Sequence, residues 1–151
     1  MVRLMTKQDI PFFNTVRNEC APKYLHDKTT HTLQEAYDWW EKDEKRTYFI
    51  FELEGRSIGY FRVYNWDDNN PKSCFLGMDI HKDYRGKKLA VTGWNHMMEH
   101  LTEQYGIKLF QVEILSHNVR SQNCCKKVGF VETKIEKRFS AEFNIFMELR
   151  V

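Results

Sequence analysis

The chain contains little that is typical of a secreted, disulfide-bonded or membrane protein. It has only four cysteines, at Cys20, Cys74, Cys124 and Cys125, and none of them form a CxxC spacing. We therefore expect free thiols in a reducing compartment. No apolar run approaches the roughly 20 residues of a membrane span, and polar residues follow the first few positions at once. The sequence thus predicts a cytoplasmic protein without a targeting or membrane segment.

Charge and histidine content exclude further classes of partner. The 23 basic and 21 acidic residues leave a formal charge of +2, dispersed along the chain, which does not favour nucleic acid or an anionic membrane. His96 and His100 are spaced for one helix face but lack a third ligand, so no metal site is predicted. A homodimer is left open by the sequence.

The rest of the composition is that of one globular domain. Hydrophobic residues make up 42% of the 151 residues and aromatic residues 15%, enough for a substantial core. We predict a single domain over residues 1–151.

Apolar periodicity and capping residues predict the order β-α-α-β-β-β-α-β-α-β-β. Thr6 and Thr32 are the expected caps of the first two helices, with Asp9 and Glu35 three positions later. Residues 20–30 are expected to be irregular. The predicted strands cover 2–5, 47–53, 57–64, 75–80, 108–114, 130–137 and 141–150, and the predicted helices cover 6–18, a segment from 32, 90–105 and 119–128.

The most informative segment is the basic turn Asp83-Tyr84-Arg85-Gly86-Lys87-Lys88-Leu89-Ala90. It joins a predicted strand that ends at Ile80 to the predicted helix that begins at residue 90. Such a turn leaves backbone N–H groups without partners at the positive end of a helix dipole, where a phosphate or pyrophosphate can bind. An ordinary solvated basic turn is an equally good interpretation of this stretch alone.

A second motif follows about 30 residues later, as Asn118-Val119-Arg120-Ser121, then Cys125, then Lys127-Val128-Gly129-Phe130. With the segment 85–90, it resembles the two motifs of the Gcn5-related N-acetyltransferase (GNAT) superfamily, Arg/Gln-x-x-Gly-x-Gly/Ala and Asn-x-x-Ser/Ala followed by Lys-x-Gly-Phe. The resemblance is nearest to the ribosomal-protein N-terminal acetyltransferase-like branch. It implies an α/β (mixed α+β) domain with a central, mostly antiparallel twisted sheet of about seven strands, helices on both faces, and a splay at the acyl-CoA site.

Two positions depart from the family pattern. Lys88 stands where the family usually has glycine, so the loop needs an unusual backbone angle or a displaced path, unless its backbone is right-handed. Cys125 stands where many members carry the tyrosine that protonates the departing thiolate. A thiol, with a reference pKa of about 8.5, can donate that proton, but a cysteine is also often buried for packing alone.

The resemblance implies that acetyl-CoA is the cosubstrate. The strand end at Met78, Asp79 and Ile80 would pair with its pantetheine arm like an added strand, and the Ile80 N–H would bind the thioester oxygen. Asn118 and Ser121 are further candidates for cofactor contact. The residues expected to bind the pyrophosphate are Arg85 through its side chain and, through their backbone N–H groups, Gly86, Lys87, Lys88, Leu89 and Ala90.

Glu113 is the leading candidate for the catalytic base. It lies on a predicted strand five residues before Asn118, a spacing similar to that of the catalytic glutamate in the family's ribosomal-protein N-terminal acetyltransferases. The alternative for Glu113 is a surface role, and Asp79 is the competing base. Cys125 is the candidate acid. No Cys-His spacing suggests an activated nucleophile, so direct transfer in a ternary complex is predicted.

Three functions are compatible with these residues. The first is acetyl transfer to a small primary amine, such as a nucleotide-linked amino sugar. The second is the same transfer to a protein N-terminus or ribosomal protein, and the third is a non-catalytic acyl-CoA-binding module. Acceptor choice is expected to depend on residues 20–30 and 66–71. Trp40, Tyr64 and Trp66 are expected to border the acceptor cleft.

Overall fold

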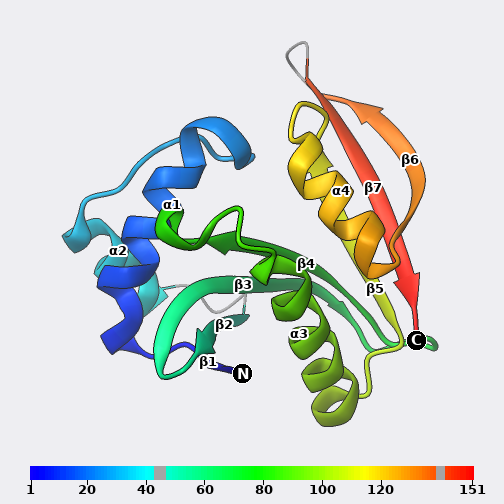
Figure 1. Ribbon diagram of the computed structural model, residues 1–151, viewed down its shortest axis with the longest axis horizontal. Helices are drawn as coiled ribbons and strands as arrows, with labels where there is room; N and C mark the ends of the chain where they lie inside the picture. Colours follow the sequence, from blue (N-terminus) through cyan, green and yellow to red (C-terminus); the bar gives the residue numbers. More distant parts are fainter. Residues whose placement is uncertain (43–46, 139–141) are drawn as a thin grey trace.

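The computed structural model describes residues 1–42, 47–138 and 142–151. Within them, seven strands form one sheet in the order β1-β2-β3-β4-β5-β7-β6 (Figure 1). Every neighbouring pair is antiparallel except β4 and β5. The predicted fold class is therefore confirmed.

The strands are β1 Val2–Leu4, β2 Thr47–Leu53, β3 Arg56–Asp67, β4 Ser73–Ile80, β5 Leu109–Leu115, β6 Val131–Lys137 and β7 Phe143–Arg150. The helices are α1 Ile10–Tyr24, α2 Leu33–Lys42, α3 Leu89–Tyr105 and α4 Val119–Val128, with short 3-10 helices at Lys7–Asp9 and Lys82–Tyr84.

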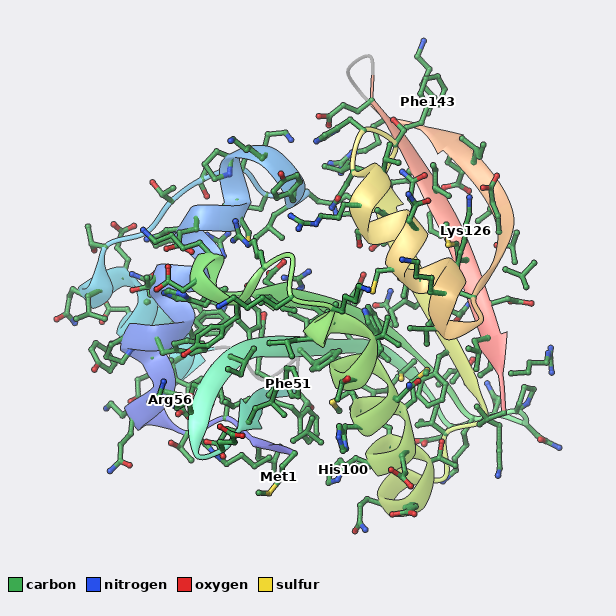
Figure 2. The ribbon with its side chains drawn as sticks, viewed as in Figure 1. Met1, Phe51, Arg56, His100, Lys126 and Phe143 are labelled. Atoms are coloured by element: carbon green, nitrogen blue, oxygen red, sulfur yellow. The ribbon has the colours of Figure 1, made fainter. Side chains whose placement is uncertain are left out.

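Helices cover both faces of the sheet, as predicted, because successive strand residues point to opposite sides. On β2, Tyr48 and Ile50 pack with α1 and α2, whereas Phe49 and Phe51 pack with α3. Figure 2 shows Phe51 inside the molecule and Arg56 at its surface. The sheet is thus the middle layer between two apolar cores. None of the described helices is long and apolar enough to cross a membrane.

The sheet opens between β4 and β5. These strands pair in parallel only over 73–75 and 109–111. β4 then continues along β3 to Ile80, and β5 continues along β7 to Leu115. Figure 1 shows the two strands diverging above this short pairing. The splay is therefore present, and it leaves one edge of β4 open beyond residue 75.

The first helix is longer than the sequence indicated. It continues past Asn18 to Tyr24, so the prediction of an irregular segment was wrong for residues 20–24 and is confirmed for residues 25–30. Cys20 and Ala21 extend the buried face of the helix into the core, and this burial outweighs the proline signal. Pro22 lies in the last turn, where its missing N–H removes a single hydrogen bond.

The predicted capping box of α2 is confirmed. The Thr32 N–H donates to Glu35 Oε1, and the Glu35 N–H donates to Thr32 Oγ1, each at 3.2 Å. At the other end of the chain, β7 begins at Phe143. Its predicted start, Ala141, lies outside the described residues.

Candidate active site

The basic turn enters α3 through two left-handed residues. Gly86 has φ of 75° and Lys88 has φ of 61°, and Lys88 directly precedes Leu89, the first residue of α3. Among the described residues, the Lys88 side chain makes no hydrogen bond to the first N–H groups of α3. The first N–H groups of α3 therefore have no acceptor within the helix, which is the arrangement that binds anions. The unusual backbone angle expected at Lys88 is present.

The Arg85 side chain points back into the protein. Its Nε donates to the Ile80 carbonyl oxygen at 2.9 Å, and its Nη2 donates to Cys20 Sγ at 3.1 Å. The same Nη2 lies 3.8 Å from Glu19 Oε2. Arg85 thus holds the loop against the end of β4 and against α1. By contrast, Arg120 flanks the loop from α4, because a Cβ on Gly86 would lie 3.2 Å from Arg120 Nη2.

The open edge of β4 presents backbone donors at alternate residues. The Lys72 carbonyl oxygen accepts from the Leu109 N–H at 3.1 Å, on the β5 side. The His81 N–H donates to the Ile58 carbonyl oxygen at 2.9 Å, on the β3 side. Because edges alternate along a strand, Met78 and Ile80 share the direction of Lys72 and aim their N–H groups at the open edge. An extended amide-containing chain such as pantetheine fits this edge.

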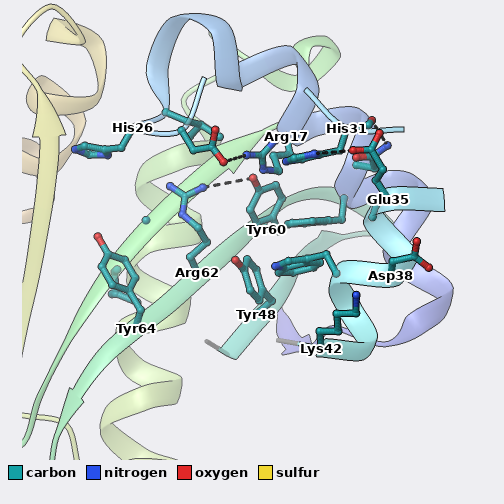
Figure 3. A pocket seen from close by; sticks show the side chains of 18 of the residues that line it. Arg17, His26, His31, Glu35, Asp38, Lys42, Tyr48, Tyr60, Arg62 and Tyr64 are labelled. Carbon is teal, nitrogen blue, oxygen red and sulfur yellow. Dashed lines mark hydrogen bonds and ion pairs between the residues drawn. The ribbon is translucent and has the colours of Figure 1, made fainter. Parts of the chain in front are cut away.

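Two cavities meet at the splay. The larger, of about 530 Å³, lies between α1, α2 and the sheet (Figure 3). The smaller, of about 50 Å³, lies between β4, β5, α3 and α4. Six residues line both cavities: Leu25, His26, Arg62, Leu76, Gly77 and Glu113. A group in the larger cavity therefore reaches the smaller one at these six residues, and the lining of the smaller cavity includes Met78 of the open edge of β4.

Glu113 lies at this junction, on β5. Its Oε1 accepts a hydrogen bond from the Tyr64 hydroxyl at 2.9 Å, which fixes the carboxylate toward the larger cavity. Tyr64, as expected, lines that cavity. Asp79 also lines the smaller cavity, so the structure brings the two candidate bases to the same cleft.

Asp79 is bound much more tightly than Glu113. Its Oδ2 accepts from the Tyr60 hydroxyl and from Arg62 Nη1, each at 2.5 Å. Only 7% of Asp79 is exposed. Burial, and then the Asp79 charge, raise the pKa of Tyr60 well above its ordinary value. This arrangement favours a structural role for Asp79 and leaves Glu113 the more accessible carboxylate.

The second motif forms the far wall of the smaller cavity. Asn118 caps α4, because its Oδ1 accepts from the Ser121 N–H at 3.3 Å. Cys125 lines the same cavity but is fully buried, and burial raises the pKa of its thiol well above the ordinary value. A thiol with a raised pKa donates its proton less readily, which disfavours Cys125 as the acid.

Sequence reasoning missed His26 and misplaced two tryptophans. His26 lines both cavities and lies 2.7 Å, through Nε2, from Asn144 Oδ1, a residue too distant in the sequence to be linked to it by any local pattern. Trp39, the neighbour of Trp40, lines the larger cavity. Trp66 instead contacts the Tyr105 ring on the α3 face, at a centroid distance of 5.4 Å. An irregularity in β3 explains this, since Asn65 has φ of 49° and interrupts the alternation of side chains.

Comparison with known proteins agrees with this geometry. The sequence matches the profile of the acetyltransferase (GNAT) family over residues 13–130. A search of the curated proteins found no significant match. The chain therefore belongs to the GNAT family, is an N-acetyltransferase, and has acetyl-CoA as the cosubstrate of its family.

Solved structures show the same fold at low sequence identity. A ribosomal-protein-alanine N-acetyltransferase from Brucella melitensis is 18% identical with a TM-score of 0.80, covering 100% of this chain and 99% of that one. A spermidine N-acetyltransferase from Vibrio cholerae, in complex with CoA and spermine, is 16% identical with a TM-score of 0.84, covering 99% and 94%. A Salmonella typhimurium protein solved with its cofactor acetyl-CoA is 18% identical with a TM-score of 0.79, covering 99% and 92%.

Proposed function

We propose that this enzyme transfers the acetyl group of acetyl-CoA to a small primary amine by direct attack in a ternary complex. The observation that carries the proposal is the meeting of the two cavities at Glu113. The larger cavity supplies space for an acceptor, and the smaller one adjoins the open edge of β4. Glu113 is the base, because its carboxylate faces the junction and is oriented by Tyr64.

The cosubstrate is bound mostly by backbone. The N–H groups of residues 86–90 bind the pyrophosphate at the entry to α3, and those of Met78 and Ile80 bind the pantetheine and the thioester oxygen. Asn118 and Ser121 complete the wall opposite β4. Arg85 acts mainly by holding the loop in place, since its guanidinium donates to the Ile80 carbonyl.

The size of the larger cavity supports a small acceptor. A volume of about 530 Å³ falls in the usual range for small-molecule sites. Its wall contains Trp39, Tyr48 and Tyr64, flat surfaces that suit a sugar ring, as in a nucleotide-linked amino sugar. A protein N-terminus is the second candidate, favoured by the full-length likeness to the Brucella ribosomal-protein-alanine enzyme.

The test is a thiol-release assay with acetyl-CoA and a panel of amino sugars, polyamines, amino acids and short peptides. We expect turnover with at least one small amine, and we expect Glu113→Gln to lower kcat by about 10²-fold or more. Acetyl-CoA should raise the melting temperature of both forms equally. Wild-type turnover by Glu113→Gln across the pH range would exclude Glu113 as the base, and preference for peptides over all small amines would favour the second candidate.

A further inference from the structure

His26 projects into the junction of the two cavities from the segment that follows α1. In Figure 3 its ring points away from α2 toward the pale yellow strand, β5. There its Nε2 lies 2.7 Å from Asn144 Oδ1, on β7. Asn144 pairs with Leu115, the last residue of β5. The hydrogen bond therefore spans the splay and holds the imidazole between its two sides, beside Glu113.

Two further contacts hold this segment in place. His117 Nε2 lies 2.5 Å from the Lys23 carbonyl oxygen, and Lys28 Nζ lies 3.2 Å from Glu142 Oε1. They occur before and after His26 in the sequence. These contacts hold the chain on both sides of His26, and the hydrogen bond from Nε2 to Asn144 holds the ring itself at the junction.

The partner atom on Asn144 sets the tautomer of His26. An amide oxygen only accepts hydrogen bonds, so the Nε2 of a neutral imidazole must carry the proton that it donates. The other ring nitrogen, Nδ1, then carries the lone pair and is the basic atom. We propose that His26 is a second proton acceptor of the transfer reaction. It takes the first proton of the acceptor ammonium at Nδ1, and Glu113 binds the ammonium group and takes the proton that the nitrogen loses during the attack. The proposal rests on the proposed function of the same site.

The surroundings keep this imidazole neutral near pH 7. Burial is the largest effect and lowers the pKa of His26 below its ordinary value of 6.5. The Asn144 hydrogen bond and the Glu113 charge oppose this shift, whereas the cationic Arg138 and Arg62 add to it. Among the described residues, these are the groups that act most strongly on the ring, and they lie on β7, on β5, on β3 and directly after β6.

A neutral imidazole is the better matched base for this step. Reference pKa values are about 6.5 for histidine and about 4.3 for glutamate, so imidazole accepts an ammonium proton more readily. One proton passes from the ammonium to Nδ1, and the neutral amine attacks the thioester carbonyl. The amine nitrogen loses its second proton to the Glu113 carboxylate as the C–S bond breaks, and Glu113 passes that proton to the departing CoA sulfur. His26 then releases the first proton to solvent.

The test compares pH profiles of kcat/KM for the wild type, His26→Gln and Asn144→Asp, measured with the best amine of the panel. Asn144→Asp keeps an oxygen acceptor but adds a negative charge, so it should raise the midpoint of the acidic limb by about one pH unit. His26→Gln should lower kcat by about 10–100-fold, leave KM within about threefold, and abolish that limb. His96→Gln, an exposed histidine on α3, is the matched control and should match the wild type. The proposal would be overturned if the acidic midpoint of kcat/KM were the same in Asn144→Asp as in the wild type. It would also be overturned if His26→Gln had the pH profile of the wild type.

A second measurement does not depend on turnover. Nitrogen-15 NMR of the histidine rings should show His26 as the Nε2–H tautomer, neutral at pH 7, with a higher pKa in Asn144→Asp. A proton on Nδ1 at neutral pH would overturn the role of His26 whether or not the chain acetylates an amine. Failure of the proposed function gives a different result, namely no acetyl-CoA thermal shift and no turnover by the wild type.

Discussion

The Arg62 guanidinium and the Asp79 carboxylate form an ion pair at the edge of the cavity junction, with Nη1 2.5 Å from Oδ2 and with side chains that are 21% and 7% exposed. Gly77 makes room for it, because a Cβ at that position would lie 2.5 Å from Arg62 Nη2. Arg62 in turn lines both cavities. The pair therefore links the stability of β3 and β4 to the shape of the site.

Asp79→Ala should destabilise the protein strongly, because it removes the partner of the Arg62 guanidinium, whose side chain is only 21% exposed, and the acceptor of the buried Tyr60 hydroxyl. We expect the free energy of unfolding to fall by about 3–5 kcal/mol in guanidinium titrations. Asp83→Ala, at an exposed carboxylate on the next loop, should change it by less than about 0.5 kcal/mol. A stable Asp79→Ala protein that had lost all turnover would instead make Asp79 the base.

The left-handed backbone of Lys88 predicts opposite effects for two adjacent substitutions. Lys88→Gly removes a side chain from a positive-φ position and should stabilise the protein by about 0.5–1 kcal/mol. Lys87→Gly, its matched control in the same loop, should destabilise it by a similar amount, since glycine only adds freedom to the unfolded chain there. Thermal unfolding of the two variants without acetyl-CoA measures both. Equal shifts would mean that Lys88 is not strained in solution.

Arg85→Ala should affect the protein even without acetyl-CoA. The guanidinium donates to the Ile80 carbonyl and to Cys20, so its loss should lower the free energy of unfolding by about 1–2 kcal/mol. Acetyl-CoA binding should weaken as well, because the loop loses its attachment to β4. Isothermal titration and chemical denaturation of one preparation give both values. Weaker binding with unchanged stability would show that Arg85 acts on the phosphates alone.

The buried cysteines predict that no acetyl-enzyme forms. Burial raises the pKa of Cys20 and of Cys74 to about 12, and it raises the pKa of Cys125 further still. Thiolates of these residues are therefore scarce at pH 8, and native protein should react slowly with a disulfide reagent, Cys124 first. Mass spectrometry after rapid quenching should find no acetyl group on Cys125. Such an adduct, formed at the rate of turnover, would replace direct transfer by a two-step reaction.

His26 predicts a loss of stability on acidification. Its folded pKa is lowered, so the unfolded chain binds the proton more strongly, and protonation destabilises the folded state as the pH falls below 6.5. His26→Gln should make the free energy of unfolding less dependent on pH below that value, and His96→Gln should not. Denaturant titrations at pH 7.5, 6.5 and 5.5 test this. Parallel pH curves for the wild type and His26→Gln would contradict the lowered pKa.

The sequence predicted correctly those features that depend on residues close together in the chain. The cap of α4 at Asn118 and the capping box of Thr32 and Glu35 involve atoms within three residues of each other, so the sequence predicts them directly. The basic turn with its glycine likewise predicted the entry to α3. Apolar periodicity predicted the order of elements along the chain, and the resemblance to the GNAT superfamily implied the splay.

The features that the sequence did not predict depend on contacts between residues far apart in the chain. Burial of Cys20 and Ala21 carried α1 through Pro22, which delivers His26 to the junction. The irregularity at Asn65 moved Trp66 to the α3 face, where an alternating pattern would have placed it beside Tyr64. The pairing of His26 with Asn144 joins two residues with no pattern in common, so only the folded chain shows it.

The backbone N–H groups of β4 point alternately to β3 and to the open edge, and this determines which substitutions the strand can accept. Its odd-numbered residues bond to β3, whereas the N–H groups of Met78 and Ile80 face the open edge. These donors belong to the backbone, so any residue except proline can supply them. A proline at either position would remove one donor of the row, whereas ordinary side-chain changes there would affect only packing. Two chains that share few identical residues can therefore carry the same row of donors.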